Sequence, residues 1–227
     1  MLNYLTSTTR PDISMATHQC ARFCEDPKAL HEHGVKHIGK YLLGTKDRGM
    51  VFKPNKDKGL ECFVDAGFAG GWQQADADNP ENVLSRTGYV IFYADCPVVY
   101  ISKLQTEIAL STAEAEYIAL SQAMRDIIPL IQLLTEIGCI WPVINPEPKI
   151  RCKVFEDNES CIAIAKSQKF SPRTRHIAIK YNHFRHFVNK SIVEFLPIDT
   201  ARQTTDILTK PLTEEIFTRL RMKLCGW

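Results

Sequence analysis

Asp65 ends a short apolar run, Leu60–Val64, and is followed by glycines at positions 67, 70 and 71. An acid at the end of a strand is a common place for a site, because sheet ends carry backbone-fixed side chains into crevices. Further acids occur in three later segments of the chain, which are Ser111–Leu120, Val154–Ile162 and Thr204–Leu212. Carboxylates brought together repel one another and favour hard cations such as Mg²⁺ or Mn²⁺ over zinc. Such a group is suited to metal-assisted hydrolysis, although each acid alone is a weak signal.

Two of these acids follow strand patterns. Apolar and polar residues alternate before Asp65, and they alternate again over Ile150–Glu156, immediately before Asp157. Asn158 and a run of apolar residues at helical spacing come next, so the unit is a strand, an acid and a helix. If the two strands are parallel neighbours, their carboxyl ends adjoin and Asp65 and Asp157 share one crevice.

The helix that begins near Ser111 carries two candidate glutamates. Ser111–Glu114 has the S-x-x-E form of a capping box, which gives Ser111 the N-cap position and Glu114 a structural role. Glu116 lies roughly 200° further around the helix and faces the sheet. A carboxylate there is unfavourable unless it is paired or bound to metal. The alternative for both glutamates, and for Asp206 after an N-cap at Thr204, is an acid stabilised by the helix dipole.

The remaining patterns supply a helical segment, three more strands and two more helices. Residues 1–58 are helical, with a second helix over 31–43 and an exposed connector at 54–59, which predicts a domain boundary near residue 58. Two strands at 88–93 and 97–102 form a hairpin, and another strand covers 191–197. Pro129 predicts that the helix after Ser111 is kinked or divided in two, ending at Gly138. Residues 214–224 form the closing helix.

Composition narrows the class of protein. With 227 residues and 44% hydrophobic residues the chain can bury a core, and its net charge of +2 does not by itself indicate nucleic-acid binding. No apolar run reaches membrane-spanning length and no signal-peptide pattern opens the chain, so we expect a soluble intracellular protein without a membrane partner. The eight scattered cysteines are expected to be reduced thiols.

Three other sets of residues could bind a metal, but a structural role is the better interpretation of each. The set Cys20, Cys24, His31 and His33 matches no closed zinc spacing. Asp76 and Asp78 lack the remaining ligands of a calcium loop and are expected in a solvated loop. His183 and His186 have no further ligand beside them.

The basic residues concentrate in one stretch, Lys166–Lys190, with aromatic residues interleaved. This stretch is either a surface that follows nucleic-acid phosphates or an amphipathic helix with a solvated basic face, and the sequence favours neither.

Six short motifs together resemble a known family, the ribonuclease H domain at the end of copia-like retrotransposon polyproteins. They occur in the family's order at Val64–Ala66, Ser85–Val90, Leu110–Tyr117, Asp157–Asn158, Arg175–Ile177 and Asp206–Leu212. Arg10–Ile13 and residues 35–45 resemble the tail of the reverse transcriptase that precedes this domain. The resemblance implies an α/β ribonuclease H-like fold, with a five-stranded mixed sheet flanked by helices over 59–227 and a helical reverse-transcriptase tail over 1–58.

The resemblance also implies a function and its residues. Asp65, Glu116, Asp157 and Asp206 would be the catalytic metal ligands for two Mg²⁺ ions, or Mn²⁺, about 3.5–4 Å apart. The expected activity is endonucleolytic cleavage of the RNA strand of RNA–DNA hybrids, beside an upstream reverse transcriptase, in a cytoplasmic virus-like particle or the nucleus. Five basic residues are expected to bind the nucleic acid, namely Lys166, Lys169, Arg173, Arg175 and Lys180.

Two departures from the family keep an alternative open. The family often has a second acid two residues after the first aspartate, where this chain has Gly67. Cellular ribonucleases H carry a histidine shortly before the last aspartate, and 196–205 contains none. The alternative is a catalytically inactive nucleic-acid-binding or connection module, against which the presence of all four acids argues.

Overall fold

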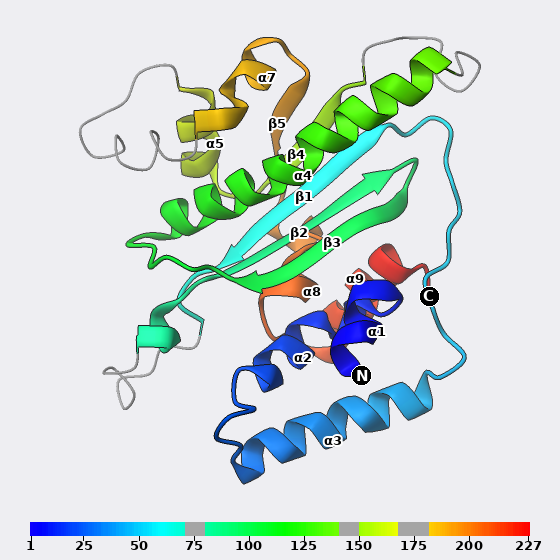
Figure 1. Ribbon diagram of the computed structural model, residues 1–227, viewed down its shortest axis with the longest axis vertical. Coiled ribbons are helices and arrows are strands. Elements are labelled where there is room, and N and C mark those ends of the chain that lie inside the picture. The colour runs from blue at the N-terminus through cyan, green and yellow to red at the C-terminus, as the bar shows by residue number, and fades with distance from the viewer. Residues whose placement is uncertain (71–79, 141–149, 168–181) are drawn as a thin grey trace.

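A computed structural model describes residues 1–70, 80–140, 150–167 and 182–227. Its centre is a mixed five-stranded sheet in the order β3-β2-β1-β4-β5 (Figure 1). The strands are β1 (Leu60–Gly67), β2 (Arg86–Tyr93), β3 (Cys96–Leu104), β4 (Cys152–Glu156) and β5 (Val193–Pro197). The first three strands are antiparallel neighbours, whereas β4 runs parallel to both β1 and β5. The predicted five-stranded mixed sheet is therefore confirmed.

The parallel pair β1 and β4 sets the position of two acids. Phe63 of β1 is the register partner of Phe155 of β4. Asp65 and Asp157 each follow two residues later, so they reach the same edge of the sheet at the same level. On the other side of β1, Gly88 of β2 is opposite Asp65. The two strands are therefore parallel neighbours, which is the condition under which Asp65 and Asp157 were predicted to share one crevice.

The helices divide between the two faces of the sheet (Figure 1). On one face, α4 (Thr112–Ile140), α5 (Glu159–Lys166) and α7 (Arg185–Asn189) pack on the larger core. On the other face, α8 (Asp206–Thr209) and α9 (Glu214–Cys225) pack on a smaller core around Phe63. Because side chains alternate along a strand, Val64 faces the larger core whereas Phe63 and Asp65 face the side of α8.

The N-terminal helices α1 (Leu2–Thr8), α2 (Ser14–Ala21) and α3 (Ala29–Gly44) lie beyond β3 (Figure 1). Arg10 is buried, forms an ion pair of 2.8 Å with Asp12, and lies over the rings of Tyr41 and Trp227. The N-terminal segment is therefore tied to the end of α9. The domain boundary near residue 58 stays a prediction. Four short 3-10 helices complete the described elements, at Pro11–Ile13, Pro80–Val83, Asn182–Phe184 and Thr200–Arg202.

Two predictions about helices were wrong in detail. Helix α4 continues through Pro129 to Ile140 as one helix, so the predicted alternative of two helices and the predicted end at Gly138 were wrong. The apolar residues on both sides of the proline pack on the same core. The N-cap of α8 is Thr205, not Thr204, and its hydroxyl makes no capping hydrogen bond. The capping box at Ser111 forms in part. The Ser111 hydroxyl accepts from the Glu114 amide at 3.2 Å, while the Glu114 carboxylate accepts from the amide of Leu110 at 2.8 Å.

All eight cysteines are free, as predicted. Within the described part of the chain, no helix has both the length and the apolar character needed to cross a membrane.

Candidate active site

Three of the predicted acids converge at the carboxyl ends of β1 and β4. One carboxylate oxygen each from Asp65, Glu116 and Asp157 lies within 4.8 Å of the other two. Asp65 and Glu116 are only 2% and 7% exposed, whereas Asp157 is half-buried. Glu116 reaches this point from the first turns of α4, on the sheet-facing side that its position in the helix predicts. Among the described residues this is the one group of acidic, histidine or cysteine side chains with metal-binding spacing. The hypothesis of a zinc site that includes Cys20 and His31 therefore has no support in the described part of the chain. Asp76 and Asp78 lie outside the described residues.

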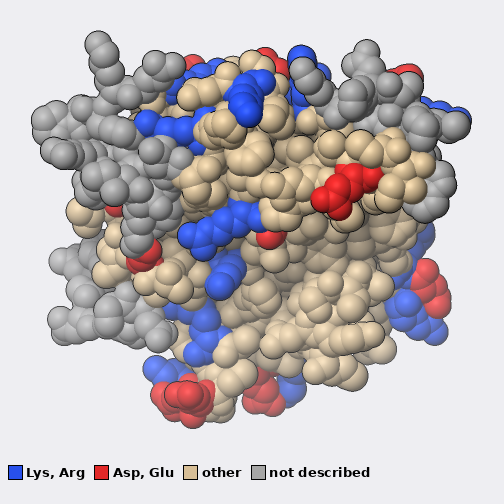
Figure 2. All heavy atoms as spheres, turned by 45° about the horizontal axis from the view of Figure 1, so that its top comes forward, with Lys and Arg blue, Asp and Glu red and all other residues tan. Residues whose placement is uncertain are grey.

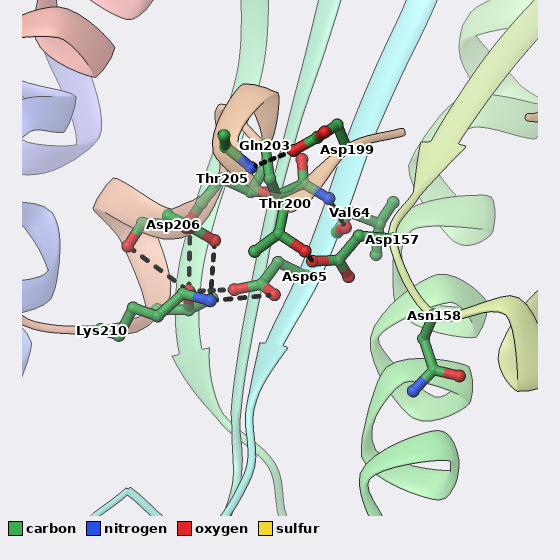
Figure 3. Close-up of polar contacts among 12 residues, drawn as sticks. Val64, Asp65, Asp157, Asn158, Asp199, Thr200, Gln203, Thr205, Asp206 and Lys210 are labelled. Atoms are coloured by element: carbon green, nitrogen blue, oxygen red, sulfur yellow. Dashed lines mark hydrogen bonds and ion pairs between the residues drawn. The ribbon is translucent and has the colours of Figure 1, made fainter. Parts of the chain in front are cut away.

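The fourth acid, Asp206, joins Asp65 through a lysine. The Lys210 ammonium lies 2.9 Å from Asp206 Oδ1 and 3.7 Å from Asp65 Oδ1 (Figure 3). The Thr209 hydroxyl donates a hydrogen bond to Asp65 Oδ2. All three residues belong to α8 or follow it directly, so one short helix brings both an acid and a cation to Asp65.

Close backbone contacts hold α8 in this place. A Cβ atom on Gly67 would lie 2.8 Å from the carbonyl oxygen of Thr209, and one on Gly88 would overlap the Thr209 methyl group. The Ser102 hydroxyl donates to the Leu208 carbonyl at 2.6 Å. Gly67 is therefore more than a missing acid, because any side chain there would push α8 and its two charged residues away from β1.

The loop between β5 and α8 supports Asp157 and β1. The Thr200 hydroxyl donates to Asp157 Oδ2 at 3.0 Å, and the Gln203 amide donates to the Val64 carbonyl at 2.7 Å (Figure 3). Asn158 caps α5 by accepting from the amide of Cys161 at 3.0 Å. These contacts hold the Asp157 carboxylate and the start of α5 in place, while Asp157 stays partly accessible.

Burial and mutual repulsion shift the proton equilibria of the acids. Burial raises the pKa of Asp65 to about 6, although the Lys210 charge and the Thr209 hydroxyl act in the opposite direction. Burial, and after it the neighbouring charge of Glu156, raises the pKa of Glu116. The pKa of Asp206 is also raised by burial, against the pairing with Lys210. Burial alone would lower the pKa of Lys210, but the charges of Asp65 and Asp206 outweigh it and raise that pKa.

The donor set fits a hard divalent cation. Carboxylate oxygens are the ligands that such cations prefer, and one oxygen of Glu116 is buried without a hydrogen-bond partner. A carboxylate oxygen in that state is costly to bury unless a cation or a proton satisfies it. Asp65, Glu116 and Asp157 are the residues that would hold the ion, with Asp206 at the side of Asp65.

Three side chains at the site were not predicted from the sequence. Glu156 is fully buried, has one oxygen without a hydrogen-bond partner, and burial raises its pKa well above the ordinary range. Its side chain faces the α4 core, because it lies on the same face of β4 as Cys152 and Val154. Thr209 and Lys210 were part of a recognised motif but had no assigned role. The spacing of Lys210, four residues after Asp206, is the signal that predicts their pairing.

Only one of the five predicted nucleic-acid-binding residues falls in the described part of the chain. Lys166 is exposed at the last residue of α5, roughly 12 Å of helix beyond Asp157 at 1.5 Å per residue. Figure 2 shows several Lys and Arg side chains close together on the face of the molecule in view. The other four residues, Lys169, Arg173, Arg175 and Lys180, lie outside the described residues, and their role stays a prediction.

Comparison with known proteins identifies relatives along nearly the whole chain. No protein-family model matches it. It is 34% identical over 99% of its length to the retrovirus-related Pol polyprotein from transposon TNT 1-94 of Nicotiana tabacum. It is 30% identical over 98% of its length to the corresponding polyprotein from transposon RE1 of Arabidopsis thaliana. The chain spans only 15% and 14% of these two relatives.

A solved structure of a ribonuclease H1 isolated from compost overlaps 71% of this chain and 96% of its own, with 17% identity and a TM-score of 0.45. The polyprotein relatives cover the chain from end to end, and the strand order with its mixed pairing is that of the ribonuclease H-like fold. The chain belongs to the family of the retrovirus-related Pol polyproteins of copia-like transposons, and it matches one segment of these relatives.

Proposed function

We propose that the chain is a ribonuclease H, which hydrolyses the RNA strand of RNA–DNA hybrids during reverse transcription of a retrotransposon. The observation that carries the proposal is the convergence of Asp65, Glu116 and Asp157 within 4.8 Å at two adjacent strand ends. Such a cluster of oxygen donors suits phosphodiester hydrolysis better than binding alone, because buried like charges are unfavourable without a cation.

The four acids take distinct parts in this proposal. Asp65 is central, since it is buried and lies between the Glu116 carboxylate and the Asp206–Lys210 pair. Two Mg²⁺ ions bound by these carboxylates would activate a water molecule and stabilise the leaving 3′-oxygen. Thr209 orients the Asp65 carboxylate and Thr200 orients that of Asp157, each through a hydrogen bond. The partly accessible Asp157 leaves an approach for the phosphate.

The proposed partners are an RNA–DNA hybrid and the upstream reverse transcriptase of the same polyprotein. The Pol polyprotein relatives support the second, because they extend far beyond the segment that this chain matches. Lys166 and the residues that follow it are proposed to contact phosphates of the hybrid, since Lys and Arg contacts to phosphates supply most sequence-independent affinity.

The test is cleavage of a hybrid whose RNA strand is end-labelled, in the presence of Mg²⁺. We expect the chain to cut the hybrid but not RNA or DNA duplexes, and to lose activity by at least about 10³-fold in Asp157→Asn. The matched control is Asp95→Asn, which makes the same change at an exposed hairpin turn. A wild type that binds the hybrid without cutting it would support the inactive binding module instead. Equal activity in Asp157→Asn would refute the site.

A further inference from the structure

Lys210 has no part in the hydrolysis proposed above, yet it lies at the centre of the site. Its ammonium contacts Asp206 Oδ1 at 2.9 Å and Asp65 Oδ1 at 3.7 Å, and Figure 3 shows it pointing between the two carboxylates. Both acids are largely buried, with 2% of the Asp65 side chain and 12% of the Asp206 side chain exposed. The lysine therefore occupies a place where a cation is required.

The backbone of Lys210 is fixed while its side chain keeps a way out. Its amide donates to the Asp206 carbonyl at 3.1 Å, and the preceding residues Ile207 and Leu208 are buried in the smaller core. Gly67 and Gly88 hold the same helix against the sheet. The Lys210 side chain is nevertheless 38% exposed, and a lysine stem of four methylene groups has several rotamers. The ammonium can leave the carboxylates without any movement of α8.

The position of Lys210 conflicts with full occupation of the site by divalent cations. A cation that binds Asp65 and Asp206 together would compete with the ammonium, which contacts the Oδ1 atom of each carboxylate. An ammonium that stayed in place would also repel the ion strongly, because two charges about 4 Å apart in a partly buried site interact by several kcal/mol. The two cations therefore exclude each other.

We propose that Lys210 is a built-in counter-ion, which pairs Asp65 with Asp206 when no metal is bound and which divalent cations displace when they enter. It is a positioning residue, since it keeps the two acids together in the metal-free chain. The displaced ammonium then lies at the open side of the site, where it can pair with a phosphate oxygen of the nucleic acid. The last step rests on the proposed ribonuclease function, whereas the displacement does not.

The first test measures Mn²⁺ binding to the chain by calorimetry, without nucleic acid. We expect Lys210→Met to bind Mn²⁺ about tenfold more tightly than the wild type, since the competing charge is gone. Lys210→Arg keeps the charge and is expected to stay within about threefold of the wild type. The control is Lys36→Met, which removes the exposed lysine of another i,i+4 ion pair, with Glu32 at 2.6 Å, and leaves Mn²⁺ affinity unchanged. Unchanged or weaker Mn²⁺ binding in Lys210→Met overturns the proposal.

The second test needs no substitution, so it holds even if Lys210→Met does not fold. Amines of the wild type are labelled by reductive methylation with and without Mn²⁺, and the modified lysines are quantified by mass spectrometry. We expect Lys210 to react about fivefold faster with Mn²⁺ present, because its ammonium then leaves the carboxylates and becomes accessible. Lys36 is the internal reference and should not change. Equal labelling of Lys210 in both conditions overturns the proposal.

The two proposals fail separately. If both Mn²⁺ effects are found but the chain cuts no hybrid, the counter-ion proposal stands and the ribonuclease proposal is wrong. If the chain cuts the hybrid but Lys210 is labelled equally with and without Mn²⁺, the ribonuclease proposal stands and the counter-ion proposal is wrong.

Discussion

The two sides of Asp65 neutralise buried carboxyl groups in opposite ways. On the Glu116 side, Glu116 and Glu156 are both buried and near enough for the charge of Glu156 to raise the pKa of Glu116, and each has an oxygen without a hydrogen-bond partner among the described residues. On the Asp206 side, Asp206 and Lys210 form a charged pair, and Thr209 donates to Asp65. The Glu116 side therefore depends on protons or a bound ion, whereas the Asp206 side brings its own cation. The burial of an acid therefore does not by itself tell whether a proton, a bound ion or a neighbouring lysine neutralises it.

The largest predicted effect separates the two glutamates of the Glu116 side. We expect Glu116→Gln to lower hybrid cleavage by at least about 10³-fold, since it removes a proposed metal ligand. Glu156→Gln should stay within about threefold, because burial raises the pKa of Glu156 and its neutral carboxyl group resembles an amide. The measurement is the single-turnover cleavage rate with Mg²⁺. Similar losses in the two variants would mean that Glu156 acts directly in the site.

The second prediction concerns Asp65, which both sides share. Its pKa in the folded chain is about 6, above the ordinary 3.8, so the unfolded chain loses this proton first as pH rises. The free energy of unfolding should then fall by about 2 kcal/mol between pH 4 and pH 6 through this group, and become level near pH 7. Denaturant unfolding in EDTA measures it, as the difference in pH dependence between the wild type and Asp65→Asn. Parallel curves for the two chains would show that Lys210 already keeps Asp65 ionised at low pH.

The third prediction tests whether the close contacts of Gly67 and Gly88 with Thr209 hold α8, and with it Asp206, against the sheet. Gly67→Ala should destabilise the chain by about 2 kcal/mol, since the new methyl group meets the Thr209 carbonyl oxygen. Gly88→Ala should have a similar effect, because its methyl group meets that of Thr209. Adding Thr209→Ser, which keeps the hydroxyl but removes the methyl group, should recover most of the loss in Gly88→Ala and none in Gly67→Ala. Unfolding in urea measures the stability of each variant. If Thr209→Ser rescued Gly67→Ala and Gly88→Ala equally, the steric contact would not be the one assigned to each glycine.

The smallest predicted effect lies outside both sides of Asp65. Lys166→Ala should weaken hybrid binding by about threefold or less and reduce the slope of log affinity against log salt by about one, with cleavage of saturated substrate unchanged. Binding titrations at several salt concentrations measure it, with Lys36→Ala as the control. A change in the cleavage rate would show that α5 influences the carboxylates as well as binding.

The sequence predicts the parts of the site that depend on strand ends. The strands before Asp65 and Asp157 are visible as alternating patterns, and the capping box at Ser111 places Glu116 on the sheet-facing side of α4. These features depend on local periodicity, which one sequence contains. The parallel pairing of β1 with β4 was a condition of the prediction that the two aspartates share a crevice, and the structure confirms it.

The rest of the site depends on contacts between distant residues, which local patterns do not encode. Asp206 has the pattern of an ordinary acid in a first helical turn, and only the packing of α8 against Gly67 and Gly88 brings it to Asp65. Gly67 was interpreted as a missing acid for the same reason, because its contact with Thr209 is invisible in sequence. Pro129 was expected to kink α4 or to divide it in two, and the division does not occur because residues on both sides of the proline are buried in the same core.

The hydrogen bonds that hold α8 also have a consequence for the order of folding. The Thr209–Asp65 contact joins residues 144 apart in sequence, and the Ser102–Leu208 contact joins residues 106 apart. Closing such long loops is slow compared with forming the local hairpin of β2 and β3. We expect α8 to dock after the sheet and α4 have assembled, so Asp206 and Lys210 arrive together at a surface that already exists. The last acid thus never approaches the others without its own positive charge.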